Sequence, residues 1–140
     1  MGRADSGTYE HFPALTAIPA IRHAFCVRVP GVDVKVDRAE ALERLAVQHQ
    51  TIRAALGIDG KEFVLGQQVH GRAVAVVDAR TRGPVGKVDA LITADPDVCL
   101  GVHVADCCAV YIVEPERRVI ALLHSGRRVC RPSRPLRPRF

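Results

Sequence analysis

Residues 109–123 read AVYIVEPERRVIALL, and this stretch decides the fold class. Two apolar runs, 109–113 and 119–123, lie on either side of the polar segment EPERR. Apolar runs of this length that flank a short polar segment are typical of a β-hairpin. The stretch therefore predicts two buried strands that pair with each other.

Toward the N-terminus, further runs rich in β-branched residues alternate with turn-forming segments. Each run has the length and composition of a strand, and we expect strands at 23–28, 63–65, 73–77, 89–93 and 98–104. A turn-rich loop at 78–87 separates two of them. The sequence therefore predicts a sheet whose strands are spread along most of the chain.

One segment has helical rather than strand periodicity. Asp37 is followed three residues later by Glu40, which resembles a capping box with a carboxylate in place of the usual hydroxyl, and Gly57 is a natural stop. Between them an apolar stripe falls on one helical face, at Leu42, Leu45, His49, Ile52 and Leu56. One helix over 38–56 and about six strands predict an α+β fold, or half of a larger mixed sheet.

The net charge of +5 is distributed unevenly along the 140 residues. Residues 127–140 contain six arginines, three prolines and no acid, whereas residues 1–126 contain 14 basic and 15 acidic side chains. We expect the Arg/Pro-rich tail to be disordered, because it has little apolar surface to bury. Since the rest of the chain is close to neutral, the pI near 9.3 does not predict a nucleic-acid partner.

The sequence also lacks the signals of membrane or secreted proteins. Every uninterrupted apolar run is far shorter than a membrane span, and the polar first 12 residues do not resemble a secretory signal. Five cysteines, an odd number, favour reduced thiols over a disulfide framework. We therefore expect a cytoplasmic protein without a membrane partner.

Three residues that could carry chemistry occur where an expected strand gives way to a loop: His70, Cys107 and His124. Two imidazoles and a thiolate suit zinc, and three protein ligands leave a fourth position open for water, as in catalytic zinc sites. Their spacing matches no short metal motif, so the pattern alone does not decide the case.

Neighbouring residues leave alternatives open. His103 would share a face with Cys107 in a regular strand and is a rival ligand, while Cys108 would then point into the core. Asp106 either orients a histidine or moves protons, or it caps a turn. The other histidines and thiols of the expected folded region are expected to be structural: His11, His23, His49, Cys26 and Cys99.

Four ordered motifs, QVHG at 68–71, DALIT at 89–93, ADC at 105–107 and HSG at 124–126, together resemble one family. It is the multicopper polyphenol oxidase, or laccase-domain, family, which includes the peptidoglycan editing factor and zinc-dependent purine nucleoside phosphorylases. The resemblance spans about residues 21–126.

The resemblance implies a mixed α/β fold with zinc held by His70, Cys107 and His124. It also implies phosphorolysis of adenosine, inosine, guanosine or methylthioadenosine, and deamination of adenosine. In this reading Asp106 and Cys107 are catalytic, and Gln68 and Arg128 contact the nucleoside or phosphate. Copper is less expected, because a multicopper oxidase needs many more histidines than the six in this sequence.

The family pattern is interrupted after HSG. Members usually continue as Trp-Arg-Gly, whereas this chain has Arg127, Arg128 and Val129. We therefore expect an irregular lead-in at 1–20, the N-terminal part of the family fold at 21–126, and a tail at 127–140 from a truncated gene or shifted reading frame. The alternative to an enzyme is an inactive zinc-binding fragment or an interaction module.

Overall fold

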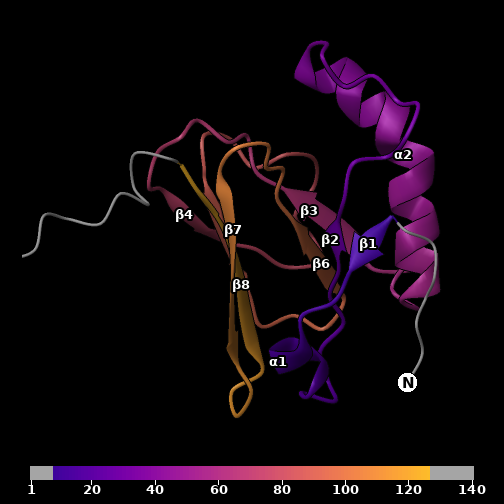
Figure 1. The fold of residues 1–140 in the computed structure, drawn as a ribbon. Helices are drawn as coiled ribbons and strands as arrows, with labels where there is room; N and C mark the ends of the chain where they lie inside the picture. The colour runs from indigo at the N-terminus through magenta and orange to yellow at the C-terminus, as the bar shows by residue number, and fades with distance from the viewer. Residues whose placement is uncertain (1–7, 127–140) are drawn as a thin grey trace, which may run out of the picture. The chain divides into compact units, whose positions relative to one another are not determined.

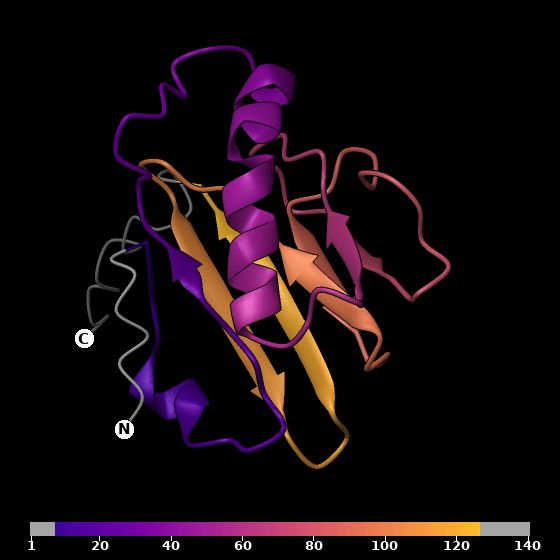
Figure 2. The same ribbon diagram turned by 90° about the vertical axis from the view of Figure 1, so that its right-hand side faces the viewer.

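The computed structural model describes residues 8–126, and the chain divides at Gly60 into two compact units (Figures 1 and 2). The expected disordered tail at 127–140, and Arg128 within it, lie outside the described residues. No helix in the described part of the chain is long and apolar enough to cross a membrane.

The N-terminal unit begins with three short elements, of which the sequence predicted only the strand within 23–28. Strand β1 (Tyr9–Glu10) pairs antiparallel with β2 (Phe25–Cys26), and helix α1 (Pro13–Thr16) lies between them in the chain. Proline fits the start of α1 because the first helical N–H needs no partner within the helix. The expected irregular lead-in therefore contains two elements, both too short to produce a periodic pattern.

Helix α2 (Arg38–Ala55) confirms the predicted helix and its start. The Asp37 carboxylate accepts hydrogen bonds from the backbone N–H groups of Ala39 and Glu40. Glu40 pairs with Arg44 one turn along the helix, and Gly57 ends the segment with a φ of +69°. The predicted apolar stripe is less exposed than the opposite face, and Ile52 is its most buried member.

The C-terminal unit contains the remaining strands in two sheets. A parallel pair joins β3 (Glu62–Leu65) to β6 (Val98–Gly101). A second sheet has the order β4-β5-β8-β7. Its members are β4 (Val74–Val76), β5 (Ala90–Thr93), β7 (Cys108–Glu114) and β8 (Val119–Ser125). The predicted α+β class is confirmed.

The predicted hairpin is also confirmed. Strands β7 and β8 are antiparallel over seven residue pairs, from Cys108 opposite Ser125 to Glu114 opposite Val119. Strand β8 is antiparallel to β5 on its other side, and β5 is parallel to β4. The hairpin therefore supplies two adjacent strands of the four-stranded sheet.

A small apolar core fixes β3, β6 and β5 within this unit. Its buried members come from these strands and the segments beside them: Val64, Val77, Val88, Leu91 and Val98. Val64 and Leu91 are each only 1% exposed. Most of the predicted strands therefore contribute side chains to one core.

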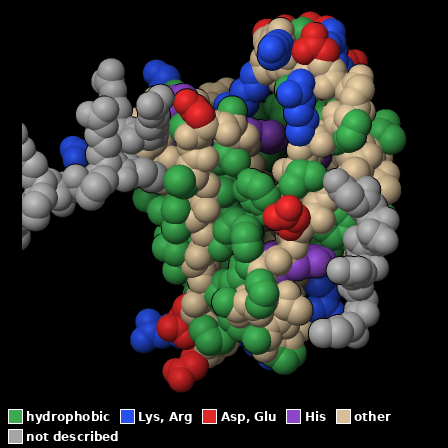
Figure 3. Space-filling view, in the orientation of Figure 1, with side chains coloured by type: hydrophobic (Ala, Val, Ile, Leu, Met, Phe, Trp, Pro, Cys, Tyr) green, Lys and Arg blue, Asp and Glu red, His purple; other side chains and the backbone are tan. Residues whose placement is uncertain are grey.

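The other face of the four-stranded sheet is apolar yet exposed, and we call it the outer apolar face. The register places Val76, Ile92, Ala121 and Ile112 in one row across all four strands. Val76 is 82% and Ile112 is 51% exposed. Figure 3 shows hydrophobic side chains gathered along β7 and β8.

Cys108 belongs to this same face, so the prediction that it is a core thiol is wrong. It alternates with Val110 and Ile112 along β7, and all three side chains are exposed. The prediction assumed that the face of this strand that carries Cys108 points into the core.

Candidate metal centre

Four chain segments bring polar side chains to one edge of the four-stranded sheet. His70 precedes β4, Asp89 directly precedes β5, Cys107 directly precedes β7, and His124 lies near the end of β8. Because β8 runs antiparallel to β5 and β7, and β4 runs parallel to β5, these strand ends all lie on the same side. The topology therefore gathers residues that are far apart in the sequence.

The ligand atoms of His70, Cys107 and His124 lie within 4.8 Å of one another. Their imidazole rings are 4.9 Å apart between centroids and nearly perpendicular. His124 is buried, Cys107 is half-buried and His70 is exposed. The group is therefore accessible from solvent on the side of His70. The structure thus brings together the three residues that the sequence singled out as metal ligands.

The buried carboxylate of Asp89 is hydrogen-bonded to two of these three residues. Asp89 Oδ1 lies 2.8 Å from His124 Nδ1, and both side chains are at most 3% exposed. The same carboxylate accepts backbone N–H groups from Val69 at 3.1 Å, from His70 at 2.9 Å and from Gly71 at 2.9 Å. Asp89 therefore contacts one candidate ligand through its ring and another through its backbone.

The environment of Asp89 keeps its carboxylate ionised. Burial by itself would raise the pKa of this carboxyl, but the hydrogen bonds from His124, Gly71, Val69 and His70 outweigh it. Together they lower the pKa from 3.8 to about 2. Because an ionised carboxylate only accepts hydrogen bonds, His124 Nδ1 must carry the proton, which leaves the Nε2 lone pair free for a metal.

The backbone of His70 has an unusual conformation. Its φ is +59°, in the left-handed region that non-glycine residues rarely adopt. Successive N–H groups around such a residue can converge on one anion, and those of residues 69–71 converge on Asp89.

Sequence reasoning did not single out Asp89, although it quoted the motif that Asp89 begins. One signal was present: an acid opens an otherwise apolar strand, in the run Val88-Asp89-Ala90-Leu91-Ile92. A buried acid in such a run must be paired or hydrogen-bonded, so it marks a site.

The structure separates His103 from the group. Among the described residues, the cluster of ligand atoms contains His70, Cys107 and His124 and not His103. Strand β6 ends at Gly101, so 103 and 107 do not share a regular strand and the face argument does not apply. Instead, His103 exchanges two backbone hydrogen bonds with the Gln68 side chain, at 2.7 and 2.8 Å.

The other predicted site residues have these positions. The exposed Asp106 side chain lies beside Cys107, with its Oδ1 at 3.6 Å from Cys107 Sγ. Gln68 is half-buried and holds the His103 backbone, while Arg128 lies outside the described residues. Asp106 thus lies close to the candidate metal ligands. Gln68 links the segment before His70 to the backbone of His103 by two hydrogen bonds.

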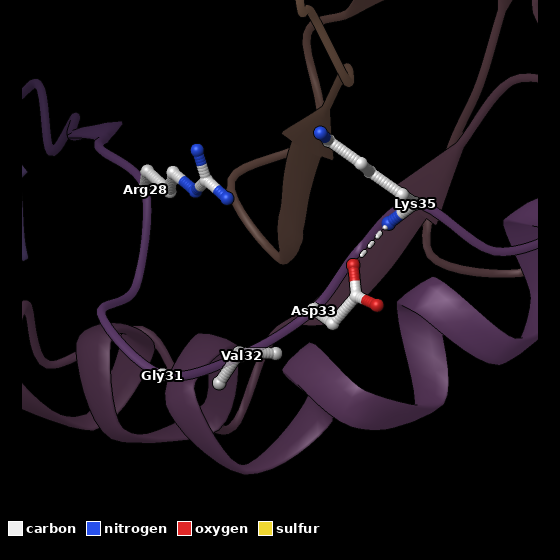
Figure 4. A pocket seen from close by; sticks show the side chains of 5 residues that line it. All are labelled: Arg28, Gly31, Val32, Asp33 and Lys35. Carbon is white, nitrogen blue, oxygen red and sulfur yellow. Dashed lines mark hydrogen bonds between the residues drawn. The ribbon is translucent and has the colours of Figure 1, made fainter.

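An open pocket in the N-terminal unit is lined by other residues. Figure 4 shows Arg28, Gly31, Val32, Asp33 and Lys35 around it, with the Lys35 backbone N–H donating to Asp33. None of these side chains was predicted to act in a site. The metal group of the C-terminal unit is therefore the better candidate for chemistry.

Comparison with known proteins gives one family, in which the similar relatives are named for two activities on purine nucleosides. Residues 29–131 match the family described as multi-copper polyphenol oxidoreductase laccase. The chain is 36% identical over 114 residues to a purine nucleoside phosphorylase of Deinococcus radiodurans, covering 76% of the chain and 44% of that protein. It is 33% identical over 84 residues to an adenosine deaminase of an unknown prokaryotic organism, covering 54% of the chain and 32% of that protein.

A solved structure has a similar fold. YlmD from Geobacillus stearothermophilus superposes with a TM-score of 0.57 at 28% identity, over 71% of this chain and 38% of that one. The chain spans less than half the length of these relatives. These findings confirm the family resemblance that the four sequence motifs indicated.

Proposed function

The chain belongs to the multi-copper polyphenol oxidoreductase laccase family, and from this premise we propose that it forms part of a zinc-dependent purine nucleoside phosphorylase. We propose that it also deaminates adenosine. The convergence of His70, Cys107 and His124 is the observation that carries the proposal. The names of its relatives suggest the substrates, a purine nucleoside and, for the phosphorylase, phosphate.

The donor set suits zinc. Two imidazole nitrogens and one thiolate are ordinary zinc ligands, and three of them leave a coordination position for water or substrate. Copper also accepts a His₂Cys set, but a laccase needs further imidazoles for a trinuclear centre. Among residues 8–126, the cluster of candidate ligand atoms contains no imidazole besides those of His70 and His124. We therefore favour zinc.

A bound zinc ion would supply Lewis acidity and lower the pKa of a bound water to about 7. The protein's own residues prepare the site for it. Asp89 holds the His124 proton on Nδ1, which leaves Nε2 as the nitrogen that can bind the metal. Cys107 must be a free thiol to bind, as it is here, and a reducing compartment such as the cytoplasm preserves it.

Asp106 is the candidate for proton transfer. Its carboxylate is exposed beside Cys107, so it can exchange protons both with solvent and with a substrate at the metal group. In phosphorolysis the bond between the purine and C1′ breaks, phosphate oxygen bonds to C1′, and the departing purine needs a proton. In deamination a water oxygen bonds to C6 of the purine, the bond from C6 to the amino nitrogen breaks, and the leaving amino group needs a proton. We assign that delivery to Asp106.

Gln68 and Arg128 are proposed to contact substrate. The Gln68 amide donates one N–H to His103 and accepts another, which leaves its second N–H for a nucleoside oxygen or nitrogen. Arg128, two residues beyond the buried Gly126, is proposed to contact phosphate.

The test measures phosphate-dependent release of adenine from adenosine by the full chain loaded with zinc. We expect adenine only when phosphate is present, and inosine in its absence. Asp106→Asn should slow both reactions while leaving zinc content unchanged, because Asp106 is not a ligand in this proposal. Asp97→Asn, at another exposed acid, is the matched control and should keep full activity.

A folded, zinc-loaded chain that releases neither adenine nor inosine would contradict the proposal. It would favour the alternative of an inactive zinc-binding fragment. A chain that is active without zinc and loses nothing in Cys107→Ser would contradict the metal-dependent mechanism.

A further inference from the structure

We infer that Asp89 is the positioning residue of the metal centre, which sets two of the three ligands through a single carboxylate. It fixes the tautomer of His124 and the backbone conformation of His70. The inference rests on the metal site of the proposed function, and it assigns a role to a residue that touches neither the metal nor the substrate.

The first contact of Asp89 fixes the His124 ring. The distance from Asp89 Oδ1 to His124 Nδ1 is 2.8 Å, and the His124 backbone N–H donates to the Asp89 carbonyl at 2.7 Å. With both side chains almost fully buried, solvent does not compete for the ring proton. A neutral imidazole has one N–H, so its placement on Nδ1 leaves Nε2 as the ligand atom.

The second contact fixes the segment that carries His70. Asp89 Oδ2 accepts the N–H groups of Val69 and Gly71, and Oδ1 accepts that of His70. A left-handed φ at a non-glycine residue is unfavourable unless surrounding contacts hold it. The three hydrogen bonds hold the 59° φ of His70, so the exposed imidazole starts from a fixed backbone position.

The two contacts use the full capacity of a carboxylate. Each oxygen accepts two of the four donors, His70 and His124 on Oδ1, Val69 and Gly71 on Oδ2. In Asp89→Asn, an NH₂ group replaces one of the two carboxylate oxygens. The two N–H donors that bonded to that oxygen would then face another donor instead of an acceptor. If the NH₂ faced His124, Nδ1 would become an acceptor and the proton would move to Nε2, which blocks that ligand atom.

The experiment reads the His124 tautomer in the metal-free full chain at alkaline pH, by long-range nitrogen–proton NMR correlation. We expect wild type to carry the proton on Nδ1 and Asp89→Asn to shift it wholly or partly to Nε2. Asp95→Asn is the matched control, because Asp95 also accepts two backbone N–H groups, from Ala79 and Asp97, but does not touch a candidate ligand. It should leave the tautomer unchanged.

A second readout uses Co²⁺ as the metal probe, followed by its visible absorption and sulfur-to-cobalt charge-transfer band. Asp89→Asn should weaken Co²⁺ binding by about 10- to 100-fold, the range found when outer partners of metal-binding histidines are removed. Asp95→Asn should bind Co²⁺ as wild type does.

An unchanged tautomer and an unchanged Co²⁺ affinity in Asp89→Asn would overturn the inference. If Asp89→Asn does not fold, wild type alone decides: a proton on His124 Nε2 would overturn it. Failure of the proposed function can be distinguished from failure of this inference. If the proposed function is wrong, wild type binds no metal or shows no nucleoside activity, while the tautomer measurement still reports on the role of Asp89.

Discussion

His23 shows how burial and a neighbouring charge act on one imidazole in the N-terminal unit. Its Nε2 accepts the Phe12 backbone N–H at 2.7 Å, and the His11 ring lies 5.0 Å away. Burial, and then the charge of His11, lower the pKa of His23 below 6.5. The sequence-based expectation of a structural histidine agrees with this environment.

The lowered pKa gives a pH dependence of stability. The unfolded chain binds a proton at His23 more readily than the folded chain, so the contribution of His23 is complete above pH 6.5 and is lost as pH falls from 6.5 toward the folded pKa. His11→Ala should raise the His23 pKa, because it removes a like charge. An NMR titration of both proteins checks this, and a wild-type pKa at or above 6.5 would contradict it.

At the same scale, the sequence predicted the three candidate ligands but not the carboxylate that holds them. His70, Cys107 and His124 belong to residue types with known metal chemistry, and each was expected where a strand gives way to a loop. The role of Asp89 depends on three backbone N–H groups of a distant turn, and no local pattern indicates which carboxylate such a turn will meet. Side-chain partners across 18 to 35 residues become visible only in the folded chain.

Among the secondary-structure elements, α2 depends on its N-cap. The Asp37 carboxylate accepts the N–H groups of Ala39 at 3.0 Å and Glu40 at 3.2 Å. We expect Asp37→Ala to destabilise the N-terminal unit by about 1 kcal/mol, and Asp37→Ser to retain most of the stability. Amide hydrogen exchange along α2 measures the effect. Equal protection in wild type and Asp37→Ala would contradict it.

Close packing beside β3 gives a second prediction. A Cβ added at Gly66 would lie 2.8 Å from the Val88 carbonyl oxygen, a backbone atom that cannot easily move. At Gly71 the nearest atoms would be 3.5 Å away, an ordinary contact. Gly66→Ala should therefore destabilise the C-terminal unit by about 1–3 kcal/mol, and Gly71→Ala by much less. Thermal unfolding checks this, and equal losses would count against it.

The extent of the strands was more predictable than their pairing. The runs at 109–113 and 119–123 are joined by a short turn, so their hairpin could be read locally, and it is confirmed. The parallel pairs β3–β6 and β4–β5, and the contact of β5 with β8, join segments that no turn connects. Their order follows from the packing of the whole unit, which local composition does not encode.

At the scale of the whole molecule, the outer apolar face is the most unusual property of the surface. Its side chains at Val74, Val76 and Ile112 are each more than half exposed. Large apolar patches on a protein surface favour association with other molecules.

Polar substitutions on this face should improve behaviour in solution. We expect Val76→Lys and Ile112→Lys to raise the concentration at which the chain stays monodisperse, with little loss of stability, because both side chains are already exposed. Leu91→Ala is the contrasting core variant, and it should lower stability by about 2–5 kcal/mol, since Leu91 is only 1% exposed. Light scattering and thermal unfolding measure the two effects. A loss of stability in the lysine variants comparable to that of Leu91→Ala would show that the face is packed in solution.

The metal content of the purified full chain tests most directly the central claim, that His70, Cys107 and His124 form one metal centre. We expect about one zinc ion per wild-type chain, and almost none in Cys107→Ser or His124→Ala. The matched controls Cys108→Ser and His11→Ala change an exposed thiol and an exposed imidazole outside the group, and they should keep the wild-type content. Equal zinc content in wild type, controls and ligand variants would contradict the claim.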